Sequence, residues 1–267
     1  MIADLHVHTT FSDSSSDISD VIRIARDKEL DAIAITDHDT VEHFTKIPSN
    51  VGVRVYAGIE ISAIHHETKT KAHILGYGIQ RPDAVAMLTL PLLEMRNSNS
   101  EKQLDILMRH GYSFETRHLL RAAGKYLYKQ HIMDWLVKTG QVGEMYGSFY
   151  YETFKNGGIC DFDIDYIDVF DAVKSIKEAG GQAVLAHPGQ QQNYALISEL
   201  AGVGLDGIEL NHRSNSVEDM RTIRDYAKRF SLFLTGGSDY HGEFSSTPID
   251  LGDIISDISG VNAVCGP

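Results

Sequence analysis

The stretch ADLHVHT, residues 3–9, decides how the rest of the chain is interpreted. Its short apolar run is typical of a strand, and side chains on a strand alternate between two faces. His6 and His8 are therefore expected to point to the same side. Two imidazoles on one side can bind a metal ion, although a His-x-His pair also occurs as an ordinary hydrogen-bonded or solvent-facing pair. The remaining sequence decides between these interpretations.

A second stretch, DAIAITDHD at residues 31–39, repeats the pattern of a short apolar strand that ends in polar residues. Residues 14–30, between the two strands, begin with Ser and Asp caps and carry apolar residues on one face, which predicts a helix. Further strands are expected at 53–62, 71–79, 182–189, 205–211 and 232–242, and further helices at 164–181, 193–202 and 216–230. This alternation predicts an α/β fold with a mainly parallel sheet or barrel.

Residues 81–161 have a different character, because no convincing strand occurs among them. A helix is expected at residues 91–112, followed by shorter helical pieces with loops. We therefore predict a helical insertion at 81–161, between two parts of a barrel at 1–80 and 162–267.

Composition excludes several classes of protein. A formal net charge of −13 over 267 residues disfavours binding to duplex DNA, which depends on Lys and Arg meeting phosphates. The two cysteines, Cys160 and Cys265, are too few and too far apart for a disulfide framework. No apolar run approaches the length of a membrane span. These features predict a cytoplasmic protein that binds neither duplex DNA nor membranes, while its oligomeric state stays open.

Residues that bind metals recur along the predicted strands and at their ends. They are His6, His8, Asp13, Asp37, His38, Glu60, His73, His187, Glu209, His212, Asp239 and His241. The C-terminal ends of the strands of an α/β barrel meet at one rim, where catalytic loops converge. Each residue alone has an ordinary structural explanation, but their recurrence on strand after strand predicts a metal site.

The order His-x-His, Thr-Asp-His, Glu, His, Ala-His-Pro, Ser-Asp-x-His resembles the polymerase and histidinol phosphatase (PHP) superfamily. With the helical insertion, the layout is similar to its stand-alone phosphoesterases. The resemblance implies a distorted (β/α)7 barrel that binds up to three divalent metal ions. It assigns three ligand sets: His6, His8, Glu60 and Asp239; Glu60, His73 and His187, with Glu60 bridging; and Asp13, His38 and His241.

Nitrogen and oxygen ligands without thiolates suit Mn, Zn or Fe ions. Clustered ions of this kind can polarise phosphoryl oxygens and convert bound water to hydroxide. We therefore expect a metal-dependent phosphoric ester hydrolase. Its expected substrate is small and phosphorylated: a nucleotide or the 5′ end of a short oligonucleotide.

Further roles are predicted for four residues. His187 or His212 is expected to protonate the leaving group, and the sequence leaves the choice open. Asp37 is expected to orient a ligand histidine through its free ring nitrogen. His131, in the insertion, and His212 are candidate substrate contacts.

Three alternatives stay open at this point. One is a histidinol-phosphate-type phosphatase, and another is a non-catalytic metal-binding domain, which would be expected to lack several ligands. The third is a metal-dependent amide hydrolase, since that chemistry also uses barrels with histidine ligands.

Overall fold

Seven strands form the main path of one sheet in the computed structural model, which describes residues 1–122 and 124–266. In sheet order they are β1 (Ala3–Val7), β2 (Ala32–Ile35), β3 (Arg54–His65), β4 (Thr70–Tyr77), β6 (Gln182–Leu185), β7 (Gly207–Asn211) and β8 (Phe233–Gly236). The chain after β8 returns to β1, where the His8 N–H donates to the Tyr240 carbonyl over 2.9 Å. The sheet is thus a nearly closed barrel, and the predicted fold class is confirmed.

One strand of the main path runs against the others. β4 is antiparallel to both β3 and β6, whereas the remaining pairs in the path are parallel. A short strand that the sequence analysis did not predict, β5 (Ile167–Asp168), pairs parallel with β3. Glu60 and His73 do not follow strand ends but lie within β3 and β4. Glu60 still reaches the rim, because β3 continues past the end of β2 and bridges to His38.

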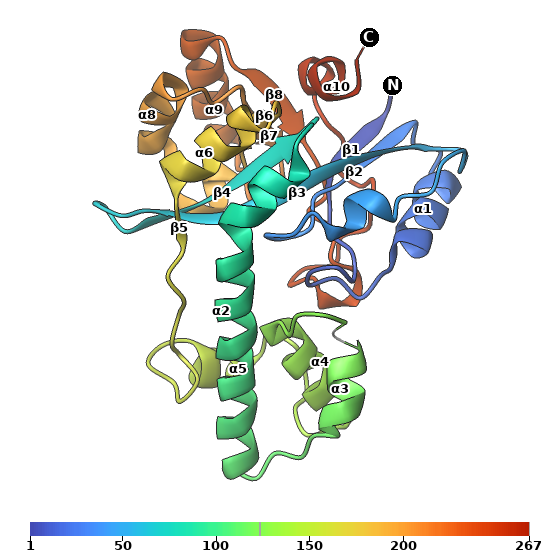
Figure 1. Ribbon diagram of the computed structural model, residues 1–267, viewed down its shortest axis with the longest axis vertical. Helices are drawn as coiled ribbons and strands as arrows, with labels where there is room; N and C mark the ends of the chain where they lie inside the picture. Colours follow the sequence, from blue (N-terminus) through green and yellow to red (C-terminus); the bar gives the residue numbers. More distant parts are fainter. Residues whose placement is uncertain (123, 267) are drawn as a thin grey trace.

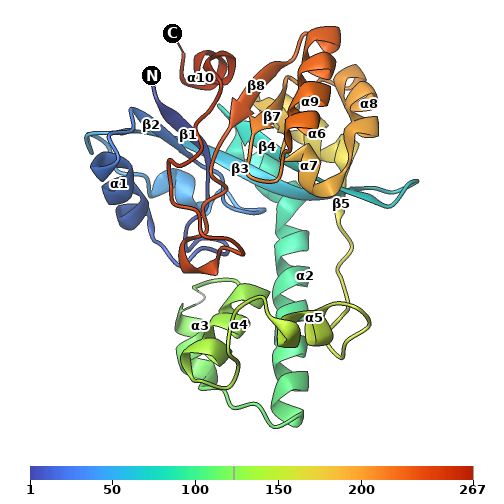
Figure 2. The same ribbon diagram turned by 180° about the vertical axis from the view of Figure 1, so that it is seen from behind.

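Helices pack on the outside of the sheet (Figures 1 and 2). α1 (Ile18–Asp27) begins after Asp17, whose carboxylate accepts the Asp20 N–H over 2.9 Å. An acidic cap of this kind supplies an acceptor for the free N–H groups of the first turn. α6 (Val169–Glu178), α8 (Ile197–Gly202) and α9 (Val217–Phe230) bury their apolar faces in one cluster with β3, β4, β6 and β7. The other short elements are η1 (Glu42–Thr45), α7 (Pro188–Gln191), η2 (Tyr194–Leu196), η3 (Gly242–Phe244) and α10 (Ile258–Cys265).

Apolar side chains fill the interior of the barrel. Leu5 on β1, Ala34 on β2, Leu75 on β4 and Val184 on β6 are buried in one cluster. β1 and β2 are separated from β4 and β6 in the sheet order, so these side chains meet inside the barrel. The Tyr77 hydroxyl donates to the Leu5 carbonyl over 2.7 Å and ties β4 to β1. This packing gives the residues at the rim a rigid base.

A long helix leads from the barrel to a group of shorter helices (Figure 1). α2 (Pro82–Arg109) starts nine residues before the predicted beginning at Pro91 and continues through that proline. α3 (Thr116–Ala122), α4 (Lys129–Lys138) and α5 (Ser148–Phe154) pack with the far part of α2 around their own buried cluster. This separate core favours an insertion at 81–161 between barrel parts 1–80 and 162–267, a division that stays a prediction.

None of the helices in residues 1–122 and 124–266 combines the length and apolar character that a membrane crossing requires.

Candidate metal centre

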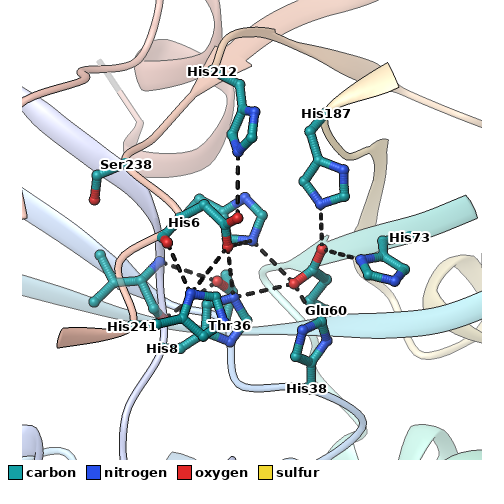
Figure 3. Close-up of polar contacts among 12 residues, drawn as sticks. His6, His8, Thr36, His38, Glu60, His73, His187, His212, Ser238 and His241 are labelled. Carbon is teal, nitrogen blue, oxygen red and sulfur yellow. Dashed lines mark hydrogen bonds and ion pairs between the residues drawn. The ribbon is translucent and has the colours of Figure 1, made fainter. Parts of the chain in front are cut away.

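Glu60 lies at the centre of a cluster of imidazole rings at one rim of the barrel (Figure 3). Five ring nitrogens lie 2.8–3.3 Å from its carboxylate oxygens: Nε2 of His6, His8 and His187, and Nδ1 of His38 and His73. The Glu60 side chain is almost completely buried. A single carboxylate therefore joins five histidines that come from four different segments of the chain.

Two further carboxylates flank this core. Asp239, which follows β8, places Oδ1 3.3 Å from His8 Nε2 and Oδ2 3.4 Å from His212 Nε2. Asp13, in the loop after β1, places Oδ1 3.4 Å from His241 Nε2. Together with Glu60, these residues form a concentrated set of nitrogen and oxygen donors.

Three overlapping groups in the described residues have donor atoms within 4.8 Å of one another. They are His6, His8, Glu60 and Asp239; His8, Asp13, His38 and His241; and His38, Glu60 and His73. The first group coincides with the first predicted ligand set. The second adds His8 to the predicted set of Asp13, His38 and His241. In the third, His38 takes the place predicted for His187, which nevertheless contacts Glu60 Oε1 at 2.8 Å. The assignment of each side chain as a ligand stays a prediction.

The hydrogen bonding of the cluster fits divalent cations. His8 Nε2, His38 Nδ1 and Asp13 Oδ1 are buried, and their close contacts with Glu60 and His241 are ion-pair contacts that lack the geometry of a hydrogen bond. A buried polar atom without a partner costs about 1–3 kcal/mol. Metal ions would give these atoms a partner, and the donor set without thiolates suits Mn²⁺, Zn²⁺ or Fe²⁺. The protein therefore has a centre suited to divalent metal ions.

The pKa shifts of the clustered side chains also fit a centre that binds cations. Burial lowers the pKa of His8, but the neighbouring carboxylates of Asp239 and Glu60 outweigh burial and raise its pKa to about 10. Burial raises the pKa of Glu60, yet the surrounding histidines, His38 first among them, hold that pKa well below its usual range. The centre thus favours positive charge, which protons or metal ions can supply. Because ligands lose protons when they bind a metal, the affinity for metals depends on pH.

The backbone is strained where it aims some of these side chains. His187 has φ of 24° and Asp239 has φ of 52°, in the left-handed region that non-glycine residues seldom occupy. Each such residue costs on the order of 1–3 kcal/mol and persists only where the surroundings impose it. At His187 the chain turns from β6 directly into α7 at Pro188. These sharp turns direct the two side chains, which follow β6 and β8, toward Glu60 and His8.

Glu209 belongs to this centre, although the sequence placed it only among the recurring metal-binding residue types and predicted neither a ligand set nor a role for it. Its Oε1 lies 3.0 Å from His6 Nδ1, and its Oε2 accepts the His187 N–H over 2.8 Å. Glu209 therefore fixes the ring of one predicted ligand and the backbone of another. Its sequence signal was a buried acid at the end of an apolar strand, beside a histidine three residues later.

Asp37 is also buried at the rim. Its backbone carbonyl accepts the Glu60 N–H over 3.2 Å, but its carboxylate forms no hydrogen bond or ion pair with a predicted metal ligand among the described residues. It accepts hydrogen bonds from Thr9 and from Ser12 Oγ, and Ser12 Oγ lies 3.4 Å from His8 Nδ1. Its other neighbour is His43, whose Nδ1 lies 3.2 Å from Oδ2. Any effect of Asp37 on His8 would therefore pass through Ser12.

The two histidines predicted to contact substrate lie in different places. His212 faces the centre: its Nε2 points at Asp239 and its Nδ1 lies 2.7 Å from Ser214 Oγ (Figure 3). His131 lies on the wall of a separate cavity of about 310 Å³, and its Nδ1 accepts the Tyr128 N–H over 3.0 Å. Burial lowers the pKa of His131 to about 4, so the ring is neutral near pH 7.

Another cavity, of about 280 Å³, opens directly beside the cluster. His38, His73 and Asp13 line one side of it. The inserted helices and the segment that follows them line the rest of it, with Arg96, Lys129, Lys155, Tyr150 and Tyr166. The arrangement places an open, cation-rich space against the metal-binding donors.

Comparison with known proteins places this geometry in a family. The family model described as "PHP domain" matches residues 4–179. A relative from Eggerthella lenta, named phosphoribosyl 1,2-cyclic phosphate 1,2-diphosphodiesterase, is 43% identical over 254 residues, which are 93% of this chain and 97% of that protein. The 3',5'-nucleoside bisphosphate phosphatase of Chromobacterium violaceum is 28% identical over 89% of this chain and 86% of its own.

Solved structures share the fold. One from Bifidobacterium adolescentis has a TM-score of 0.87 at 24% identity, covering 98% of this chain and 94% of its own. A second, described as an amidohydrolase from Chromobacterium violaceum, has a TM-score of 0.81 at 26% identity, covering 94% and 90%. The barrel and the inserted helices are thus both part of a known architecture.

Proposed function

This chain belongs to the PHP domain family and is a metal-dependent hydrolase of phosphoric esters, and we propose that it acts on a small phosphorylated ribose derivative. The observation that carries the proposal is the position of Glu60 among five imidazoles, beside a cavity rich in cations. The donors suit metal ions and the cavity suits an anion.

The candidate substrates follow from the two relatives. Both names describe a ribose unit with two phosphoryl groups: a phosphoribosyl cyclic phosphate in one case and a nucleoside bisphosphate in the other. At 43% identity, the first makes a phosphoribosyl cyclic phosphate the first candidate here. A nucleotide is the second candidate. The 5′ end of a short oligonucleotide is the third, because a cavity of about 280 Å³ accommodates only a small ligand.

Up to three divalent ions, Mn, Zn or Fe, would be held by the nine predicted ligands. They are His6, His8, Asp13, His38, Glu60, His73, His187, Asp239 and His241. Such ions supply polarisation of the phosphoryl oxygens and a hydroxide nucleophile at neutral pH. The chain itself holds the ligand rings in place, through Glu209 at His6 and through Ser12 at His8.

Two histidines are candidates to deliver a proton to the leaving oxygen. His187 Nε2 is held 2.8 Å from Glu60 Oε1, which favours the role of metal ligand for His187. Among the described residues, His212 forms no hydrogen bond or ion pair with Glu60, and Ser214 fixes its ring so that Nε2 faces the centre. We therefore assign the proton donor to His212 (Figure 3). Because its ring faces the centre, His212 is also suited to contact the substrate.

The decisive experiment measures phosphate ester hydrolysis by the Mn²⁺-loaded protein. The panel contains ribose 1,2-cyclic phosphate with and without a 5-phosphate, nucleoside 5′-monophosphates, 3′,5′-bisphosphates, a short 5′-phosphorylated oligonucleotide and histidinol phosphate. Because opening of a cyclic ester releases no phosphate, the products are separated by chromatography as well as assayed for inorganic phosphate. Asp239→Ala is the control that should lose turnover.

The same panel decides between the alternatives. Turnover of histidinol phosphate alone would assign the histidinol-phosphate-type activity. A set of amide substrates is tested in parallel, because one structural neighbour is described as an amidohydrolase. Absence of turnover on every ester, with metals confirmed by elemental analysis, would reject the proposal in favour of amide hydrolysis or of a binding domain.

A further inference from the structure

The cavity beside the metal centre has a cationic end that the hydrolysis of a single phosphate does not require. Arg96 of α2, Lys129 of α4 and Lys155 at the end of α5 all line it. The chain has only 24 Lys and Arg residues against 37 Asp and Glu. Three cations at one cavity are therefore a local reversal of the overall charge, and such a concavity attracts anions.

The two lysines differ from the other cations of this region, because their charges are available. No carboxylate in residues 1–122 and 124–266 forms an ion pair with Lys129 or Lys155, whereas Arg96 Nη2 donates to Asp39 over 2.8 Å. Asp163, an acid that also lines the cavity, is already paired with Lys71 at 2.5 Å. A ligand anion would therefore not have to displace a protein carboxylate from either lysine.

Lys129 is held in position rather than free in solvent. Its Nζ lies 5.3 Å from the centre of the Phe154 ring, and Phe154 is buried in the core of the inserted helices. Burial, with a further contribution from Lys155, lowers the pKa of Lys129 to about 8. A desolvated ammonium group beside a second cation is costly unless an anion binds there.

Arg96 lies between the metal centre and the two lysines. Its side chain contacts Ser62 and Asp39 near the cluster, its Cζ lies 5.4 Å from the Tyr128 ring, and its Nε is buried without a hydrogen-bond partner. Tyr128 directly precedes Lys129. The cavity thus runs from His38 and His73, labelled beside Glu60 in Figure 3, past Arg96 to the lysines.

We infer that Lys129 and Lys155 form a second anion subsite, which binds a phosphate of the substrate other than the one that is hydrolysed. The inference rests on the proposed function, and it narrows the substrate class to small ribose derivatives that carry two phosphates at a fixed separation. The metal centre would bind the scissile phosphate, the one that is hydrolysed. The inserted helices would select substrates by binding the other, distal phosphate.

The test compares substrates that differ only in the distal phosphate. Hydrolysis of ribose 1,2-cyclic phosphate is measured with and without a 5-phosphate, and adenosine 5′-monophosphate is compared with adenosine 3′,5′-bisphosphate. The quantity is the ratio of kcat/KM values within each pair, for wild type, Lys129→Met, Lys155→Met and the double variant. Methionine keeps an apolar stem of similar length against Phe154. Lys174→Met, on the exposed face of α6 and outside the cavity, is the matched control.

The preference for the doubly phosphorylated substrate should fall about tenfold in Lys129→Met, through KM, since hydrogen bonds to charged groups are the strong ones. Lys155 is exposed, so its loss should cost less, a few-fold. Lys174→Met should change nothing. Binding of ribose 5-phosphate, followed by calorimetry on the metal-loaded protein, should weaken in the same order.

Two results would overturn the subsite while leaving the hydrolase intact. One is that both members of a pair are hydrolysed and that the ratio of their kcat/KM values is the same in wild type and in the double variant. The other is an equal loss on both members, which would assign the lysines to folding or to the scissile group. If the wild-type protein hydrolyses no member of either pair, it is the proposed function that fails.

Discussion

The two walls of the cavity differ in how firmly their side chains are held. Directly behind the barrel wall, which His38 and His73 line, Glu60 is contacted by five histidines, and Glu209 fixes two of their segments. On the helical wall, Lys129 and Lys155 have no ion pair with a described residue, and Lys155 is exposed. The first wall is a shared network in which each change affects several contacts. The second is a set of separate contacts, which can change the choice of substrate without disturbing the chemistry.

Replacing Glu60 is the change that should do most damage to the barrel wall. Glu60→Gln keeps the shape of the side chain but removes the negative charge that faces five imidazoles. We expect a loss of kcat on the order of 10³ or more, comparable to the loss of a principal electrostatic group, together with loss of bound metal. Enzyme assays and elemental analysis measure both. Full metal content with normal kcat would show that the network does not depend on Glu60.

Glu209 should have a smaller effect that is specific to orientation. Because it contacts His6 through a ring nitrogen and His187 through the backbone, Glu209→Gln should lower metal affinity or activity by about 10–100-fold, the usual effect of groups that orient ligands. Titration of metal into the apoprotein measures the affinity. Glu199→Gln, on the surface of α8, is a matched control that should leave it unchanged. An unaltered affinity in Glu209→Gln would limit this residue to a structural role.

Metal ions should stabilise the barrel wall more than the helical wall. A ligand that binds only the folded state adds about 2.7 kcal/mol at 100 times its Kd, and each kcal/mol raises Tm by about 2–4 °C in proteins approaching this size. Mn²⁺ should therefore raise Tm by roughly 5–10 °C, and EDTA should reverse the shift. Hydrogen exchange should show protection around β1, β3 and the segment after β8, with little change in α3 to α5. Equal protection of α3 to α5 would contradict the separation of the two walls.

The sequence predicted the barrel wall far better than the helical wall. Local patterns sufficed to select His6, His8, His38 and Asp239 as candidates, because each stands in a short motif beside an apolar strand, and the barrel brings their donor atoms close together. Glu209 lacked such a motif: its role depends on contact with His6, more than 200 residues away in the chain. The antiparallel direction of β4 was not predicted either, because an apolar run does not indicate which way a strand runs in the sheet.

The helical wall depends on tertiary packing that periodicity does not encode. Lys129 and Lys155 are 26 positions apart, and only the fold of α4 against α5 brings them to one cavity. The sequence instead predicted a substrate contact for His131, which lies in α4 and lines another cavity. Nothing in the pattern of α2 distinguished Arg96 from the charged residues of an exposed helical face. A cation becomes a binding group only through what surrounds it, and that information is in the fold.

The helical wall should also give the subtlest effect, a dependence on pH between about 7 and 9. Burial and Lys155 lower the pKa of Lys129 to about 8, so the side chain is cationic below that pH and loses its charge above it. The distal phosphate is fully ionised in this range, since its second pKa is about 6. KM for the doubly phosphorylated substrate should therefore rise a few-fold from pH 7 to pH 9, relative to the substrate that lacks the distal phosphate. Taking the ratio removes the pH dependence of the metal centre, which both substrates share. Lys129→Met should abolish the change in the ratio, and Lys129→Arg, which stays charged, should abolish it while keeping the low KM. A ratio that rises with pH in Lys129→Met as it does in wild type would show that another group senses the proton.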